Sequence, residues 1–184
     1  MRDIVVTEKL DGTNAQILID ETGTKMTIGS RNRIITPEDD NYGFARWCKD
    51  NEAELLKLGP GRHFGEWWGA GIQRRYSVAE KRFSLFNVGR WKSLLTPSIP
   101  GVFEGNVDGG IAGPLCCYVV PTLYEGPFNM ALIDAALAQL KEHGSVAAPG
   151  FLDPEGIVIL HKASGTLFKR TVKNDESPKG MVAS

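Results

Sequence analysis

The sequence predicts an antiparallel-rich α+β fold, and three of its features support that prediction. Apolar and polar residues alternate through much of residues 3–30, as they do in strands with one buried face. Apolar residues three and four apart indicate a helix late in the chain. The 21 glycines and 10 prolines among 184 residues favour turns and loops over a helical bundle.

The individual elements follow from these patterns. Strands are expected at Asp3–Thr7, Ala15–Asp20, Lys25–Ser30, Arg62–Trp67, Arg82–Val88, Leu115–Tyr124, Glu155–His161 and Thr166–Thr171. Helices are expected at Asn41–Leu58 and Asn129–His143. Pro97–Pro114 lacks periodicity and is expected to form a long surface loop. We expect one domain over residues 1–173 and a loose tail over residues 174–184.

The composition excludes several classes of protein. No apolar run approaches the roughly 18 residues of a membrane span, and the N-terminal residues begin no signal peptide. The three cysteines, Cys48, Cys116 and Cys117, form no CxxC pair and disfavour a secreted disulfide framework. The three histidines are scattered, so no zinc site is expected. We therefore expect a cytoplasmic protein without zinc, in monomeric form.

The first candidate for chemistry is the run Glu8-Lys9-Leu10-Asp11-Gly12-Thr13-Asn14, at the end of the first expected strand. Alternation along a strand places Lys9 and Asp11 on the same side, before Gly12 lets the chain turn. A lysine amine attacks phosphorus or a carbonyl carbon only when unprotonated, which burial or nearby cations favour. The motif alone is a weak signal, because about one chain of this length in thirty contains it by chance.

Further segments strengthen the signal because each supplies a group that nucleotide chemistry needs. They are, in chain order, Ser30-Arg31, Phe64-Gly65-Glu66, Phe83-Ser84-Leu85-Phe86, Glu155-Gly156-Ile157-Val158-Ile159 and Phe168-Lys169. A planar guanidinium grips phosphate, a flat ring stacks on a base, and acids at strand ends accept hydrogen bonds or bind cations. A second lysine would both favour the neutral form of the first and hold a phosphate.

Together these segments resemble the covalent nucleotidyltransferase superfamily, which contains ATP-dependent DNA ligases, RNA ligases and mRNA capping enzymes. The resemblance runs from Glu8 to about Lys173. It is closest to the RNA ligase 2 type, because DNA ligases and capping enzymes usually carry an arginine where this chain has Asn14. The run Val120–Phe128 is similar to that group as well. The resemblance implies an antiparallel-rich, ATP-grasp-like nucleotidyltransferase domain without a C-terminal accessory domain.

The resemblance also implies a catalytic set of Lys9, Asp11, Glu155 and Lys169. Lys9 would be the nucleophile that forms lysyl-AMP from ATP with loss of pyrophosphate. Glu155 would help to hold Mg²⁺ or Mn²⁺, and Lys169 would neutralise the α-phosphate. These roles suit nucleotidyl transfer, which depends on the positioning of the reacting groups and on charge neutralisation.

Nucleotide-binding roles are implied for three other residues. Arg31 would contact the phosphate or ribose of AMP, and Phe86 would stack on adenine. Glu66 would contact the ribose hydroxyl or serve as a second metal ligand.

The expected partner is nicked or broken RNA, with DNA left open. Asn14 would act when AMP moves to a 5′-phosphate and a 3′-hydroxyl attacks. Basic residues that could meet nucleic-acid phosphates are Arg33, Arg74 and Arg75. The formal net charge of −1 does not itself indicate a nucleic-acid-binding protein, so these contacts would be local.

Three departures from the family pattern affect the functional prediction. Asn87 stands where the family often has aspartate after the aromatic residue. The last motif usually has two lysines one residue apart, but Thr171 follows Arg170 here. Lys173 and Lys179 remain the alternatives for the second lysine. Little sequence follows Lys173, which supports lysine adenylylation more strongly than efficient strand sealing.

The sequence therefore leaves several functions open. An ATP-dependent RNA ligase is the leading hypothesis, and a DNA ligase core is the close alternative. A non-sealing adenylyltransferase, a capping-like guanylyltransferase or a nucleic-acid-binding module with an inactive site are the others. Strand preference, the preferred metal, the oligomeric state, the host, and whether the chain is a minimal enzyme or a fragment stay undetermined.

Overall fold

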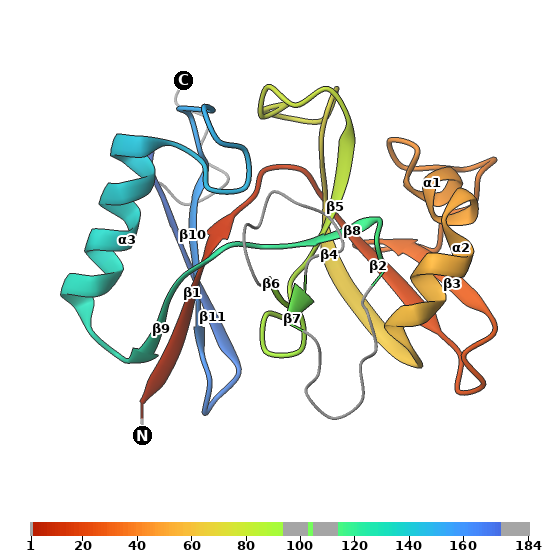
Figure 1. Ribbon diagram of the computed structural model, residues 1–184, viewed down its shortest axis with the longest axis horizontal. Coiled ribbons are helices and arrows are strands. Elements are labelled where there is room, and N and C mark those ends of the chain that lie inside the picture. Colours follow the sequence, from red (N-terminus) through yellow and green to blue (C-terminus); the bar gives the residue numbers. More distant parts are fainter. Residues whose placement is uncertain (1, 94–102, 105–113, 174–184) are drawn as a thin grey trace. The chain divides into compact units, whose positions relative to one another are not determined.

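A computed structural model of the chain describes residues 2–93, 103–104 and 114–173, so the expected tail lies outside it (Figure 1). The chain forms two compact units. The terminal unit comprises Met1–Leu10 and Thr122–Ser184, and the central unit comprises Asp11–Pro121. Each unit has its own largely antiparallel sheet with helices beside it, which confirms the antiparallel-rich α+β class. Within the described ranges, no helix is long and apolar enough to cross a membrane.

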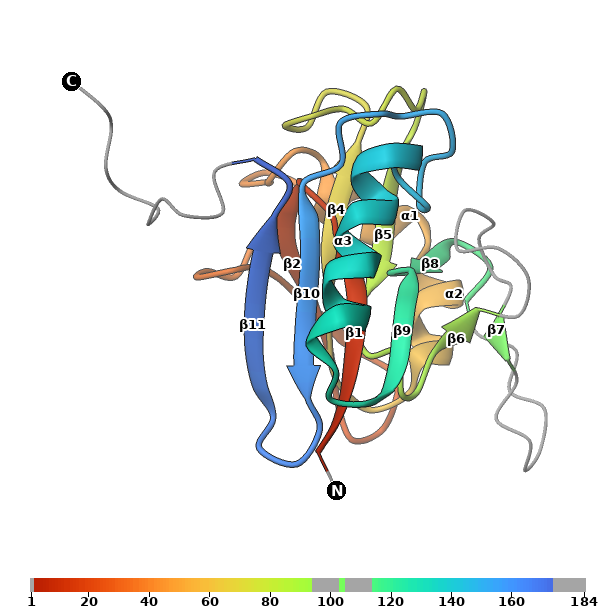
Figure 2. The same cartoon turned by 90° about the vertical axis from the view of Figure 1, so that its left-hand side faces the viewer.

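The terminal unit contains a four-stranded antiparallel sheet in the order β11-β10-β1-β9. Its strands are β1 (Asp3–Lys9), β9 (Thr122–Pro127), β10 (Gly156–His161) and β11 (Thr166–Thr171). Helix α3 (Met130–His143) lies along one face of this sheet (Figure 2). Between them lies a cluster of buried apolar residues: Ile4, Val6, Ile133, Ala136, Leu140, Ile157 and Ile159. Since side chains alternate along β1, Lys9 belongs to the face away from α3.

Helix α3 has clear caps in the sequence. The side-chain oxygen of Asn129 accepts hydrogen bonds from the backbone N–H groups of Ala131 at 2.9 Å and Leu132 at 3.4 Å. Gly144 follows the helix with a φ of 86°, a conformation that side chains other than glycine rarely adopt. The predicted helix is confirmed, with its first residue serving as the cap.

The central unit contains a five-stranded sheet in the order β3-β2-β4-β5-β8. Its strands are β2 (Thr13–Ile19), β3 (Met26–Ser30), β4 (Gly61–Gly69), β5 (Lys81–Leu85) and β8 (Cys117–Val119). Neighbours run antiparallel except β5 and β8, and β6 (Lys92–Ser93) pairs separately with β7 (Phe103–Glu104). The aromatic core of this unit centres on Phe44, whose ring lies 5.3 Å from Trp67 and 5.0 Å from Phe83.

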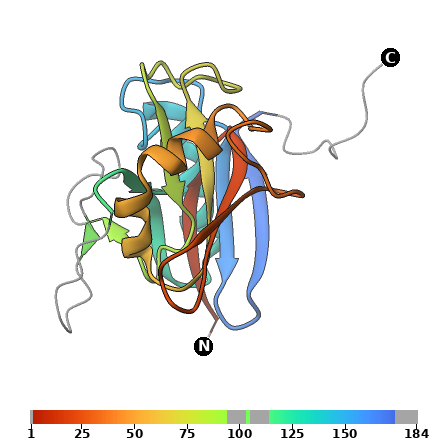
Figure 3. The same ribbon diagram turned by 90° about the vertical axis from the view of Figure 1, so that its right-hand side faces the viewer.

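The predicted helix at Asn41–Leu58 is shorter and interrupted in the structure (Figure 3). Helix α1 spans Phe44–Asp50, α2 spans Glu52–Leu55, and the 3₁₀ turn η1 spans Leu56–Leu58. Asn51 separates α1 from α2, and its side-chain amide donates to the backbone carbonyl of Trp47 at 2.8 Å. Asparagine interrupts helices because its side chain competes for backbone groups in this way. Helical spacing places Trp47 and four other apolar residues near one face; Trp47 is half-buried, and the four that are buried are Phe44, Cys48, Leu55 and Leu58.

The strand predicted at Leu115–Tyr124 is divided between two sheets. Its first part forms β8, and its second part begins β9. Pro121 lies between them and has no backbone N–H to donate to a sheet, so the strand cannot continue through it. The expected loop at Pro97–Pro114 lies largely outside the described residues, although Phe103–Glu104 forms β7.

Candidate active site

Lys9, the predicted nucleophile, is the last residue of β1 and lies opposite Gly156 of β10. Its ammonium group forms an ion pair with the carboxylate of Glu155. The two side chains are only 13% and 9% exposed, so water and salt screen their attraction weakly. Strand pairing therefore brings together a lysine and an acid from opposite ends of the sequence.

Lys169, the second predicted lysine, lies on the same face of the sheet as Lys9. In β11 it pairs with Val158 of β10, which pairs in turn with Thr7 of β1. Directly paired residues point to the same face, and Thr7 is two residues before Lys9. The face opposite α3 thus carries two lysines separated by one strand, and Lys169 is exposed. Such a face can attract an anionic ligand.

The place of the missing second lysine is taken by Thr171. Thr171 pairs with Gly156 and therefore lies in the same cross-strand row as Lys9. Lys173, one of the two candidate replacements, pairs with the carboxylate of Asp153 at 2.6 Å. Lys179, the other candidate, lies outside the described residues.

Glu8 points to the face opposite Lys9, as alternation along β1 predicts. One of its carboxylate oxygens accepts the backbone N–H groups of Val146 at 2.9 Å and Ala147 at 3.0 Å. These two residues belong to the segment between α3 and β10 that leads to Glu155. The sequence analysis did not predict that Glu8 binds the backbone of this segment. The sequence feature that could have indicated it is an acid at a strand position where alternation with apolar neighbours predicts burial.

Burial gives Glu8 an unusual titration. The side chain is 1% exposed, and desolvation raises its pKa above the ordinary 4.5, against the opposing hydrogen bonds from Ser145, Ala147 and Val146. A raised pKa in the folded state means that this state binds the proton more tightly than the unfolded state does. The resulting stabilisation is present at low pH and is lost as pH rises from about the unfolded value through the folded one.

We therefore expect the unfolding free energy of the wild type to contain a component that falls as pH rises above about 4.5. Glu8→Gln keeps an acceptor oxygen but cannot titrate, so it should remove this component. Urea unfolding at a series of pH values, with both proteins in the same buffers, measures the difference between them. Parallel pH profiles for the two proteins would show that Glu8 does not titrate in this way.

In the central unit, Glu66 of β4 holds residues of the lysine motif. One carboxylate oxygen accepts the N–H of Gly12 at 3.0 Å, and the other accepts the side-chain N–H of Asn14 at 3.2 Å. Glu66 is 6% exposed, and these donors offset the cost of removing its carboxylate from water. The acid that the resemblance assigns to ribose or metal thus also fixes the chain just after the predicted nucleophile.

Asp11 contacts the loop between β4 and β5 through both backbone and side chain. Its N–H donates to the hydroxyl oxygen of Tyr76 at 2.9 Å, and its carboxylate accepts Nε–H of Arg74 at 2.9 Å. Sequence reasoning missed Tyr76 and assigned Arg74 to nucleic acid. Arg74 already has a carboxylate partner here, whereas Arg75 is exposed.

The other predicted binding residues lie on the surface of the central unit. Arg31 is exposed just after β3, and the nearby Arg33 forms an ion pair with Asp39. Phe86 is 39% exposed, and its N–H donates to the carbonyl of Phe64 at 3.0 Å, which extends the pairing of β5 with β4. A ring held in this way at a strand end is available for stacking.

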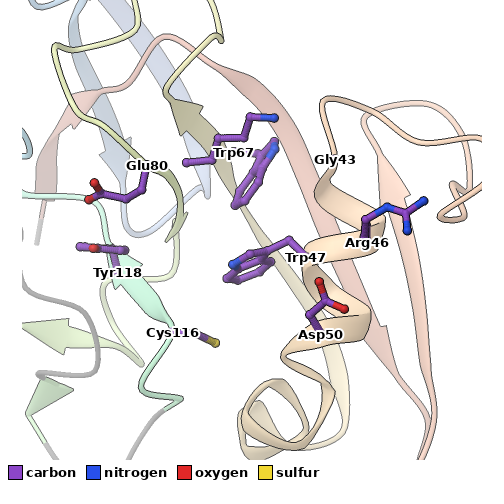
Figure 4. Close-up of a pocket in the computed structure, with 9 residues that line it drawn as sticks. Gly43, Arg46, Trp47, Asp50, Trp67, Glu80, Cys116 and Tyr118 are labelled. Carbon is purple, nitrogen blue, oxygen red and sulfur yellow. The ribbon is translucent and has the colours of Figure 1, made fainter.

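An open hollow of about 560 Å³ lies elsewhere on the central unit (Figure 4). Its lining residues are Gly43, Arg46, Trp47, Asp50, Trp67, Glu80, Lys81, Cys116 and Tyr118. The rings of Trp47 and Trp67 lie 5.0 Å apart and form part of its apolar wall. None of the residues predicted for catalysis or binding lines it, so this hollow is separate from the predicted site residues.

Comparisons with known proteins identify a family and a fold. The family model described as RNA ligase matches residues 2–173. A variant of the Naegleria gruberi RNA ligase with ATP and Mn has a TM-score of 0.60 at 16% identity, covering 94% of this chain and 50% of that one. A second variant with ATP and Mn has a TM-score of 0.55 at 17% identity, covering 91% and 48%. An apo variant has a TM-score of 0.59 at 16% identity, covering 92% and 49%.

At such low identity these likenesses show the fold alone. The chain spans about half the length of the solved structures that it matches. No curated protein matches it in sequence.

Proposed function

Because the chain belongs to the RNA ligase family, we propose that it is the adenylylating core of an ATP-dependent RNA ligase. The observation that carries this proposal is the contact between Lys9 and Glu155 at low exposure. Lysine and glutamate are rarely buried without a partner or a function. A shielded lysine beside an acid, on a face that carries a further lysine, suits nucleotidyl transfer.

In the first step the neutral amine of Lys9 attacks the α-phosphorus of ATP. An N–P bond forms, the bond from the α-phosphorus to the oxygen bridging it to the β-phosphate breaks, and pyrophosphate leaves. The amine gives up a proton. AMP then moves to the 5′-phosphate of a nucleic-acid strand, which restores Lys9, and a 3′-hydroxyl displaces AMP to join the strands.

The remaining residues bind and orient the nucleotide in this proposal. Lys169 neutralises the α-phosphate, because it shares the sheet face of Lys9 and is exposed. Phe86 stacks on adenine with its partly exposed ring, and Arg31 contacts the phosphate or ribose. Asn14 is held against Glu66 and takes part in the later steps.

Glu155 fits a divalent cation better than Glu66 does. The Oε2 atom of Glu155 is buried and accepts no hydrogen bond of normal geometry from the described residues. Its contact with Lys9 is an ion pair. Both oxygens of Glu66, in contrast, already accept hydrogen bonds. Mg²⁺ or Mn²⁺ supplies, when bound, positive charge for the phosphate oxygens.

The rest of the ligand shell would come from ATP and water. Within the described ranges, no three His, Cys, Asp or Glu side chains gather closely enough to hold a metal. Magnesium commonly binds one or two carboxylates together with phosphate oxygens and water, which agrees with a single glutamate here. The Naegleria gruberi structures with ATP and Mn support this choice of nucleotide and metal.

A non-sealing adenylyltransferase is the second candidate, because the contact of Lys9 with Glu155 bears on adenylylation and not on the later transfer of AMP to a strand. The test is incubation with α-labelled ATP and Mg²⁺ or Mn²⁺, followed by denaturing electrophoresis. The labelled protein is then chased with 5′-phosphorylated nicked RNA or DNA.

A ligase forms a labelled band and passes the label to the strand, with RNA on the 3′-hydroxyl side preferred because a protein can sense 2′-hydroxyls. A band that cannot be chased supports the adenylyltransferase. Folded protein that forms no band with either metal overturns both proposals.

A further inference from the structure

The loop between β4 and β5, residues 70–80, has an unusual backbone. Four residues other than glycine have positive φ angles: Gln73 at 44°, Arg75 at 62°, Tyr76 at 49° and Ser77 at 53°. Each such residue costs on the order of 1 kcal/mol, and such strain persists only where surrounding contacts enforce it. In this loop, Tyr76 and Arg74 both contact Asp11.

Tyr76, which contacts Asp11, is a buried residue. Its side chain is 1% exposed, and its ring packs edge-on against Trp68 with centroids 5.0 Å apart and an interplanar angle of 71°. The hydroxyl oxygen then accepts the backbone N–H of Asp11 at 2.9 Å. A buried ring held in this way gives the backbone at Asp11 a rigid anchor.

Further groups bind the same short stretch of chain. Arg74 Nε donates to the carboxylate of Asp11, and Glu66 accepts the N–H of Gly12. Gly12 packs closely against β4, because a Cβ there would lie 2.3 Å from the carbonyl oxygen of Trp67. The two residues after Leu10 are therefore anchored by two backbone amides and one carboxylate.

We propose that Tyr76 and Arg74 are positioning residues for the reaction of Lys9. The inference rests on the proposed function above, and it concerns residues that neither the motifs nor the comparisons assign to this role. Leu10 alone separates Lys9 from Asp11, so the covalent chain links the nucleophile directly to the anchored backbone at Asp11. A misplacement of about 1 Å can slow a reaction on the order of a hundredfold without weakening substrate binding.

The decisive variant is Tyr76→Phe, which removes only the hydroxyl group. We expect the rate constant of adenylylation at saturating ATP to fall about tenfold or more, while KM for ATP changes less than about twofold. Tyr118→Phe is the matched control, because it removes a hydroxyl from another largely buried tyrosine of the same unit. Its rate constant should equal that of the wild type.

Arg74 provides a second variant that does not alter the core, since its side chain is 28% exposed. Arg74→Met keeps the length of the side chain and should slow adenylylation, whereas Arg74→Lys keeps the charge beside Asp11 and should restore part of the rate. A wild-type rate constant in both Tyr76→Phe and Arg74→Met, with the adduct formed normally, overturns this inference alone. An absent adduct in the folded wild type overturns the proposed function and this inference with it.

Discussion

Replacing Lys9 by alanine is expected to lower formation of the AMP adduct by roughly a thousandfold or more, because no other atom takes over a nucleophile's role. The lysine is held by Glu155 at 13% exposure, and the proposed function makes its amine the nucleophile. Quantification of the label bound to protein after incubation with α-labelled ATP measures the effect.

Two further variants make this result specific. Lys9→Arg keeps a cation beside Glu155 but supplies no neutral amine, so it should fold normally and form no adduct. Lys162→Ala removes another lysine of the terminal unit, one paired with Glu125, and should leave adduct formation unchanged. Adduct formation at the wild-type rate in Lys9→Ala would mean that the nucleophile lies elsewhere.

Gly156→Ala is expected to destabilise the terminal unit by roughly 3 kcal/mol or more. Gly156 has a φ of 154°, and a Cβ there would lie 2.1 Å from the carbonyl oxygen of Arg170 and 2.7 Å from Cα of Thr171. Since both are backbone atoms of β11, the clash can be relieved only by moving β11 away from β10. Urea unfolding of the variant against the wild type measures the loss.

Gly165→Ala is the matched control for this substitution. Gly165 has a φ of 66°, and a Cβ there would meet no atom within 4 Å. It should therefore cost only about 1 kcal/mol, from the backbone conformation alone. If Gly156→Ala were no less stable than Gly165→Ala, the pairing of β10 with β11 at Gly156 would be looser than the structure shows.

Features set by local sequence were predictable. Strand β11 has the predicted bounds, and α3 begins one residue after the predicted start at Asn129, because alternation and helical spacing are properties of neighbouring residues. The resemblance placed both Lys9 and Glu155 in the active site, but their contact was not predicted. Strand register then explains it, since Lys9 pairs with Gly156, the next residue after Glu155.

Features set by distant contacts were not predictable. Tyr76 meets Asp11 across 65 positions of sequence, and no periodicity indicates such a pair. The contact of Arg74 with Asp11 was not predicted either, and the expected contact of Arg74 with nucleic-acid phosphates stays a prediction. The helix break at Asn51 coincides with a side-chain hydrogen bond to the carbonyl of Trp47, and an apolar pattern does not reveal such a bond.

The most direct test of the whole account is to locate the AMP. The protein is incubated with ATP and Mn²⁺, digested, and its peptides are analysed by mass spectrometry. We predict one modified peptide, with AMP on Lys9 through a linkage that acid cleaves and alkali does not, as expected of an N–P bond. AMP on any other residue, or folded protein without modification, would contradict the assignment of Lys9 as the nucleophile.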